Sequence, residues 1–280
     1  MRADLARTLS ELRRCVRASA CVAVIWLSLP AGAAEISLEE RLNELRQAYP
    51  GHIMSMNGTT LTMSDRAQMH IDDGEQRKSF NDKLEHADVE DMLSQVYPVI
   101  TCVQPGSRPA LDFDPGRIRN EAFFKAIYGK SAAEVTANLV QVDWFGQPLS
   151  VNKQLGIDKK LSAVVEELKP KLATLRSYLL PSAGTFNWRP IAGTSRLSTH
   201  SYGIAIDIST AKSDYWRWSK GAPKNVGAPT HKIPGEIVAA FERQGFIWGG
   251  NWYHYDTMHF EYRPELVAIG RLAEKRGCVQ

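Results

Sequence analysis

The apolar pattern of this chain changes its period near residue 185, and this change constrains the fold more than any other feature. Before it, apolar residues recur at helical spacing, most clearly in "DKKLSAVVEELKPKLATLRSYLL", where Pro170 should kink or divide the helix. After it, "TFNWR", "GIAIDIS" and "MHFEYR" show the two-residue period of short strands. An amphipathic helix, "PGEIVAAFERQGF", separates the last two. Because no βαβ repetition is present, the pattern predicts an α+β fold, not a doubly wound sheet.

The region before this change, residues 35–170, is predicted to be mainly helical with one hairpin. "SLEERLNELRQAY" has a serine cap and helical leucine spacing, and "HIMSMNGTTLTMSD" alternates around the turn signal Asn57-Gly58. Residues 104–116, "QPGSRPALDFDPG", are rich in proline and glycine, which makes them the best candidate for a loop or subdomain boundary. The role of residues 35–170 is not indicated by their sequence.

Residues 1–34 are predicted to be a signal peptide. Five arginines precede the short apolar stretch "ACVAVIWLSLPAGAA", which ends in the small-residue pattern of a cleavage site. We expect cleavage after Ala33 or Ala34, which would leave no stable membrane span; the alternative is an uncleaved N-terminal anchor. The protein is therefore expected to be exported, to the periplasm or beyond, in a bacterium.

Removal of this segment changes the charge of the chain. Of 34 basic and 31 acidic residues, five arginines and two acids lie in residues 1–34, so 29 of each remain. The net charge of +3 therefore belongs to the signal segment. A nucleic-acid partner is not expected, because such proteins need a concentrated basic surface.

The cysteines that remain after cleavage form an even pair. Cys15 and Cys21 lie in the signal segment, which leaves Cys102 and Cys278. In an exported protein this pair predicts a disulfide, and the alternative is two unpaired core residues.

Three residues in the second half of the chain are candidates for metal binding. "STHSYGIAID" contains His200 and Asp207, and "WGGNWYHYDTMHFEYRP" contains His259. If "GIAIDIS" is a strand, Gly203 and Ala205 share the face of Asp207 and leave open space in front of this acid. Two imidazoles and a carboxylate are zinc ligands, and three protein ligands leave a fourth position for water.

A further acid stands beside these candidates. Asp256 precedes His259 by three residues and could take a proton from a metal-bound water. Spacing alone leaves alternatives open: His254 competes with His259 as a ligand, Glu261 is an outer partner or another base, and all of these are equally compatible with structural residues.

The two segments together resemble a known family. "STHSYGIAID" is similar to the S-x-H-x-x-G-x-A-x-D signature of the zinc D-alanyl-D-alanine carboxypeptidases, and "GFIWGGNWYHYDTMHFEY" resembles their second block. That family also contains the vancomycin-resistance dipeptidases and carboxypeptidases and the L-alanyl-D-glutamate endopeptidases of phage endolysins. The similarity covers about residues 180–265. It implies a Hedgehog/DD-peptidase-like fold, a small antiparallel sheet flanked by helices, with residues 171–280 as the peptidase domain.

The resemblance also implies roles for individual residues. His200, Asp207 and His259 would bind Zn²⁺, and Asp256 would be the catalytic acid and base. The D-x-x-H spacing resembles the endopeptidase branch of the family.

Other positions match the family pattern less closely. The family's upstream arginine, which helps to hold the substrate carbonyl or carboxylate, has its nearest match in Arg189 of "NWRP", with Arg196 as the fallback. Ser198 matches the signature and would bind substrate or cap a turn. Trp252 would line the substrate groove or the core.

These inferences predict a zinc metallopeptidase that cuts peptidoglycan stem peptides, either as a D-Ala-D-Ala carboxypeptidase or as an L-Ala-D-Glu type endopeptidase. One alternative is a non-catalytic exported protein of the same fold that binds wall peptides, although a pure binder has no need of Asp256. Another is a structural or partner-binding protein whose functional part is residues 35–170. The oligomeric state is not predicted.

Overall fold

The computed structural model describes residues 35–104, 106–221 and 226–278. They belong to one compact unit, Ala33–Gln280. The predicted signal segment lies outside the described residues. Residues on both sides of position 170 belong to the same unit, and the boundary predicted there stays a prediction. No helix within the described ranges is both long and apolar enough to cross a membrane.

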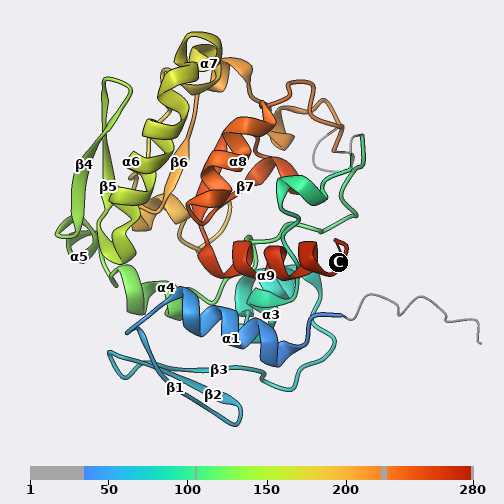
Figure 1. The fold of residues 1–280 in the computed structure, drawn as a ribbon. Helices are drawn as coiled ribbons and strands as arrows, with labels where there is room; N and C mark the ends of the chain where they lie inside the picture. Colours follow the sequence, from blue (N-terminus) through green and yellow to red (C-terminus); the bar gives the residue numbers. More distant parts are fainter. Residues whose placement is uncertain (1–34, 105, 222–225, 279–280) are drawn as a thin grey trace, which may run out of the picture. The chain divides into compact units, whose positions relative to one another are not determined.

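The first half of the described chain contains helices, a three-stranded sheet and a hairpin, which confirms the α+β prediction (Figure 1). The sheet has the order β1-β2-β3, and its first turn follows Asn57, as the turn signal predicts. The elements of this half are α1 (Leu38–Ala48), β1 (Ile53–Asn57), β2 (Thr60–Met63), β3 (Gln68–His70), α2 (Phe80–His86), α3 (Val89–Leu93), α4 (Glu121–Tyr128), α5 (Ala132–Thr136), β4 (Leu139–Trp144) and β5 (Gln147–Asn152).

The second half begins with two helices that meet at Pro170, as predicted. A 3₁₀ segment, Lys169–Lys171, separates them, because proline lacks the N–H that would continue the α-helical ladder. The elements of this half are α6 (Ile157–Leu168), α7 (Leu172–Leu179), β6 (Ala205–Asp207), α8 (Gly235–Arg243), β7 (Phe246–Trp248), β8 (His259–Tyr262) and α9 (Pro264–Lys275).

The small antiparallel sheet of this half has the order β6-β8-β7. The central strand, β8, is buried along its whole length. Its register sets Asp207 of β6 directly opposite His259 of β8. Side chains directly opposite each other in an antiparallel pair are close neighbours, so the pairing of these strands brings two of the candidate ligands together.

Two expectations about this sheet are wrong. "TFNWR" forms no strand and makes only isolated bridges at its flanks, since Gly184 has a φ of 118° and Pro190 lacks an N–H for a ladder. The strand "GIAIDIS" is shorter than predicted, because Gly203 ends a 3₁₀ turn with a φ of 66°. A Cβ at Gly203 would lie 2.6 Å from Leu139 Cδ2, so the space in front of this glycine is filled by β4 and is not a cleft.

The two ends of the described chain lie side by side. Helix α1 packs against α9 (Figure 1). A disulfide joins Cys102 to Cys278, the pair expected from the sequence, with Cα atoms 5.4 Å apart. This bond ties the C-terminal end to the middle of the chain.

Candidate functional site

The three candidate ligands converge on one point. His200 Nε2 lies 3.2 Å from Asp207 Oδ1 and 3.2 Å from His259 Nδ1, and His259 Nδ1 lies 2.9 Å from Asp207 Oδ1. Both histidines are buried, whereas the Asp207 side chain keeps 23% of its surface exposed, so the cluster is accessible from the side of the carboxylate. A tetrahedral ion with bonds of about 2.0–2.1 Å separates its ligands by about 3.3 Å. The three separations are therefore close to those of a zinc ligand set.

The outward-facing nitrogens of both rings are held by other groups. His200 Nδ1 contacts the carbonyl oxygen of Thr185, which can only accept, so this nitrogen carries the proton. His259 Nε2 lies 3.1 Å from Glu261 Oε2 and therefore donates to this buried carboxylate. In the neutral form of each ring, the nitrogen that faces Asp207 is thereby left with a lone pair. Outer partners of this kind orient histidine ligands in metal sites.

A cation fits this arrangement on electrostatic grounds. Two nitrogen lone pairs and a carboxylate oxygen that face each other within 3.2 Å repel one another unless a positive charge lies between them. Burial opposes ionisation of Asp207, but the two imidazoles outweigh burial and lower its pKa. Burial likewise opposes the charge on His259, yet contacts with Asp207 and Glu261 raise its pKa to about 10. The carboxylates that favour this proton on His259 would also favour a divalent ion, which would replace the proton at Nδ1.

Asp256 lies beside this cluster as an acid with free hydrogen-bonding capacity. Its Oδ1 is buried and has no hydrogen-bond partner. Burial raises its pKa to about 6, which suits a group that accepts and releases a proton near neutral pH. Its backbone is fixed by the N–H bond to Gly249 O (3.0 Å) and by the carbonyl bond from the His259 N–H (3.1 Å). Gly249 has no room for a side chain, because a Cβ there would lie 2.6 Å from the Asp256 carbonyl oxygen.

The competing residues have other partners. His254 Nδ1 lies 2.6 Å from Asp114 Oδ2, and this histidine is not part of the converging cluster. Glu261 contacts the nitrogen of His259 that faces away from Asp207, and its other oxygen lies 3.3 Å from Arg263 Nη1. These contacts place Glu261 as an outer partner of His259.

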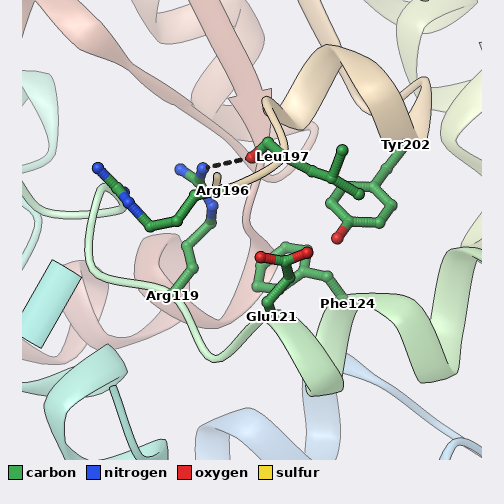
Figure 2. Close-up of a pocket in the computed structure, with 6 residues that line it drawn as sticks. All are labelled: Arg119, Glu121, Phe124, Arg196, Leu197 and Tyr202. Atoms are coloured by element: carbon green, nitrogen blue, oxygen red, sulfur yellow. Dashed lines mark hydrogen bonds between the residues drawn. The ribbon is translucent and has the colours of Figure 1, made fainter. Parts of the chain in front are cut away.

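The two arginines that the sequence suggested for substrate binding make contacts elsewhere and not with Asp256. Arg196 forms an ion pair with Glu85 (3.0 Å) and lines a small pocket behind the His200 turn. Figure 2 shows this pocket, in which the Arg119 side chain reaches the carbonyl oxygen of Leu197. Arg189 is exposed, and only its backbone makes hydrogen bonds with other described residues. Nothing in these contacts brings either predicted arginine to Asp256.

The remaining predicted residues lie next to the cluster. Ser198 caps the 3₁₀ turn Thr199–Tyr202 by accepting from His200 N, which is a structural role. The Trp252 ring centre lies 5.6 Å from that of His259, and its Nε1 donates to Pro115 O (2.7 Å). Trp252 is buried and forms part of the wall behind His259.

The end of the segment 104–116, which the sequence predicts as a loop or boundary, is attached to the site by hydrogen bonds, together with the adjoining Arg117. Tyr253 N donates to Phe113 O, His254 N donates to Asp114 Oδ1, and Arg117 Nη2 donates to His254 O, each at 2.8 Å. The proline and glycine of this segment predict a turn and carry no information about its partner. The sequence therefore did not identify Asp114 and Arg117 as residues that contact the site.

The fold and the cluster together define a class: an α+β protein with a buried two-histidine, one-carboxylate site of the kind that metal-dependent hydrolases use. Residues 192–262 match a protein-family model described as D-alanyl-D-alanine carboxypeptidase, so the part of the chain that carries the site is similar to this peptidase family. The matched segment contains the three candidate ligands and Asp256, whereas Arg117 and Arg189 lie outside it. Searches of curated proteins and of solved structures gave no match.

Proposed function

We propose that this protein is an exported zinc metallopeptidase that hydrolyses peptide bonds in the stem peptides of bacterial peptidoglycan. The observation that supports it most is the convergence of His200 Nε2, Asp207 Oδ1 and His259 Nδ1 within 3.2 Å, with each outer imidazole nitrogen already held by another group. The family match supports the peptide substrate. The bond that is cut is either D-Ala-D-Ala at the carboxyl end or L-Ala-D-Glu within the stem.

His200, Asp207 and His259 would hold the zinc ion. When bound, zinc polarises the scissile carbonyl and lowers the pKa of a coordinated water towards about 7. Asp256 would accept a proton from the attacking water as the oxygen bonds to the carbonyl carbon. It would then pass this proton to the nitrogen of the leaving amine as the C–N bond breaks, which yields a carboxylic acid and an amine and returns Asp256 to its starting state.

The proposed location follows from the substrate. Peptidoglycan lies outside the cytoplasmic membrane, and the signal segment predicted in residues 1–34 would deliver the enzyme there. The disulfide between Cys102 and Cys278 supports an oxidising compartment such as the periplasm.

The test combines metal content with hydrolysis on one sample of the mature protein. We expect about one zinc ion per chain, in line with the single three-ligand cluster at the site. Digestion of purified peptidoglycan should release peptide fragments whose masses identify the bond. The variant Asp256→Ala should keep the zinc and release none. Zinc without cleavage would favour a wall-peptide-binding protein, and a protein without zinc affinity would contradict the proposal.

A further inference from the structure

The carboxylate of Asp256 is held in place only through the backbone. Its Oδ1 has no hydrogen-bond partner, and within the described ranges its side chain forms no hydrogen bond or ion pair. The backbone N–H of this residue donates to Gly249 O (3.0 Å). The next residue is attached to the same place, since Trp248 Nε1 donates to Thr257 O (2.9 Å). The position of Trp248 and Gly249 therefore contributes directly to where the carboxylate lies.

Tyr97 holds both ends of the turn that contains this glycine. Its hydroxyl accepts from Trp248 N (3.0 Å) and from Asn251 Nδ2 (3.3 Å), and it donates to the buried carboxylate of Glu242 (2.8 Å). A phenolic hydroxyl has one proton and two lone pairs, so these three bonds use its whole capacity. Tyr97 is fully buried, and the residue after it accepts a second bond from Asn251 Nδ2, at Pro98 O (3.0 Å). The turn is thus fixed to the first half of the chain at both ends.

A second segment, residues 214–216, supports the residues on either side of Asp256 through two backbone hydrogen bonds of 2.9 Å. The N–H of Asp256 itself donates to Gly249 O and not to this segment. Without the Tyr97 hydroxyl, two buried donors of the turn would lose this acceptor, which is costly unless the turn moves towards another one. We therefore expect the turn to shift the carboxylate, while the second segment keeps the loop attached.

We infer that Tyr97 is a positioning residue that sets the location of the Asp256 carboxylate through the turn Gly249–Asn251. This inference rests on the proposed function, in which Asp256 carries the proton. A misplacement of about 1 Å in such a group lowers a rate by about 100-fold without any change in the metal ligands. Tyr97 lies outside residues 192–262, so the region before the matched segment contributes to the geometry of the site.

The test compares Tyr97→Phe with the parent on the mature chain, residues 35–280. The reporter is the backbone N–H of Asp256, because its acceptor, Gly249 O, is not altered by the substitution. Hydrogen exchange at this amide, followed by NMR on the metal-free protein, should become about tenfold faster, since a lost hydrogen bond has about that effect. The kcat for hydrolysis of stem peptides should fall about tenfold or more, whereas KM and the zinc dissociation constant should stay unchanged.

The matched control is Tyr49→Phe. Tyr49 is also fully buried, and its hydroxyl donates to a buried glutamate, Glu265 (2.7 Å), but it lies on α1 and forms no hydrogen bond with the described residues of the turn. This variant loses the same kind of bond and should keep the exchange rate of Asp256 and the kcat of the parent. Unchanged exchange at Asp256 in Tyr97→Phe, or an equal increase in both variants, would overturn the inference. A zinc affinity that falls in step with kcat would overturn it as well.

Two further readouts keep the result decisive. If Tyr97→Phe does not fold by circular dichroism, Asn251→Ala removes the bonds from the end of the turn to Tyr97 and Pro98 and should also speed exchange at Asp256; unchanged exchange there overturns the inference. Hydrolysis by the parent is measured separately. Its absence would contradict the proposed function, whereas the exchange of the Asp256 N–H decides the positioning role without turnover.

Discussion

At the scale of single residues, Glu261 determines which nitrogen of His259 is free to bind a metal. Its carboxylate accepts from His259 Nε2, and its other oxygen contacts Arg263, which also pairs with Glu265. Burial would raise the pKa of Glu261, but His259 and Arg119 outweigh burial and hold this pKa at about 2. The carboxylate is therefore ionised whenever the protein is folded at neutral pH.

The substitution Glu261→Gln should weaken zinc binding by about tenfold or more, because the amide still accepts from His259 but no longer increases the basicity of its ring. Competition with a chromophoric chelator measures the dissociation constant. The melting temperature of the metal-free protein, taken in parallel, separates this effect from a loss of stability. An unchanged zinc affinity would mean that Glu261 serves packing alone.

At the scale of elements, helix α8 is joined to the first half of the chain through a buried acid. Glu242 is 2% exposed and accepts from the backbone N–H of Ile100 and from the Tyr97 hydroxyl. The same hydroxyl accepts from the backbone N–H of Trp248, which precedes the turn Gly249–Asn251. This chain of contacts links α8 to the loop that positions Asp256.

Burial raises the pKa of Glu242 to about 7. Between pH 4.5 and 7 the folded protein holds a proton there that the unfolded chain releases, so this stabilisation is complete below pH 4.5 and is lost as the pH rises through 7. Its loss should lower the free energy of unfolding by about 3 kcal/mol. Urea unfolding across this range should show the decrease, and Glu242→Gln should remove its upper part, because buried Asp256, with a pKa of about 6, adds to the decrease below that pH. An equally steep decrease in the variant would assign the effect to another group.

The helices and strands also show which features of secondary structure can be predicted from the sequence. The division at Pro170 and the hairpin turn after Asn57 were predicted correctly, because proline and an Asn-Gly pair act through their own backbone geometry. "TFNWR" was predicted wrongly, since alternation does not reveal whether a neighbouring strand is available for pairing. The position of Gly203 was missed for a related reason, because its contact with Leu139 joins residues that are distant in sequence.

At the scale of the whole molecule, some residues of the candidate site lie in local sequence motifs, whereas others reach the site only through tertiary contacts. The three candidate ligands and Asp256 could be named because each lies in one of two local motifs. Asp114 and Arg117 could not, since their contacts with His254 form only when residues 113–117 fold against a loop far along the chain. The site is thus built from both sides of residue 170.

This shared construction predicts that residues 171–280 do not fold as an isolated fragment. The fragment lacks Cys102, the Tyr97 hydroxyl that accepts from Trp248 N, and the Gly116 carbonyl that accepts from Arg263. Buried donors such as the Arg263 guanidinium would lose their acceptors, at a cost of about 1–3 kcal/mol each, and apolar faces now covered by the first half would become exposed. Near-ultraviolet circular dichroism of the fragment should show no fixed aromatic packing, and zinc binding should be weak.

Residues 35–280 are the control, and co-expression of 35–170 with 171–280 should restore both signals. A fragment that binds zinc tightly and hydrolyses peptidoglycan by itself would contradict this prediction.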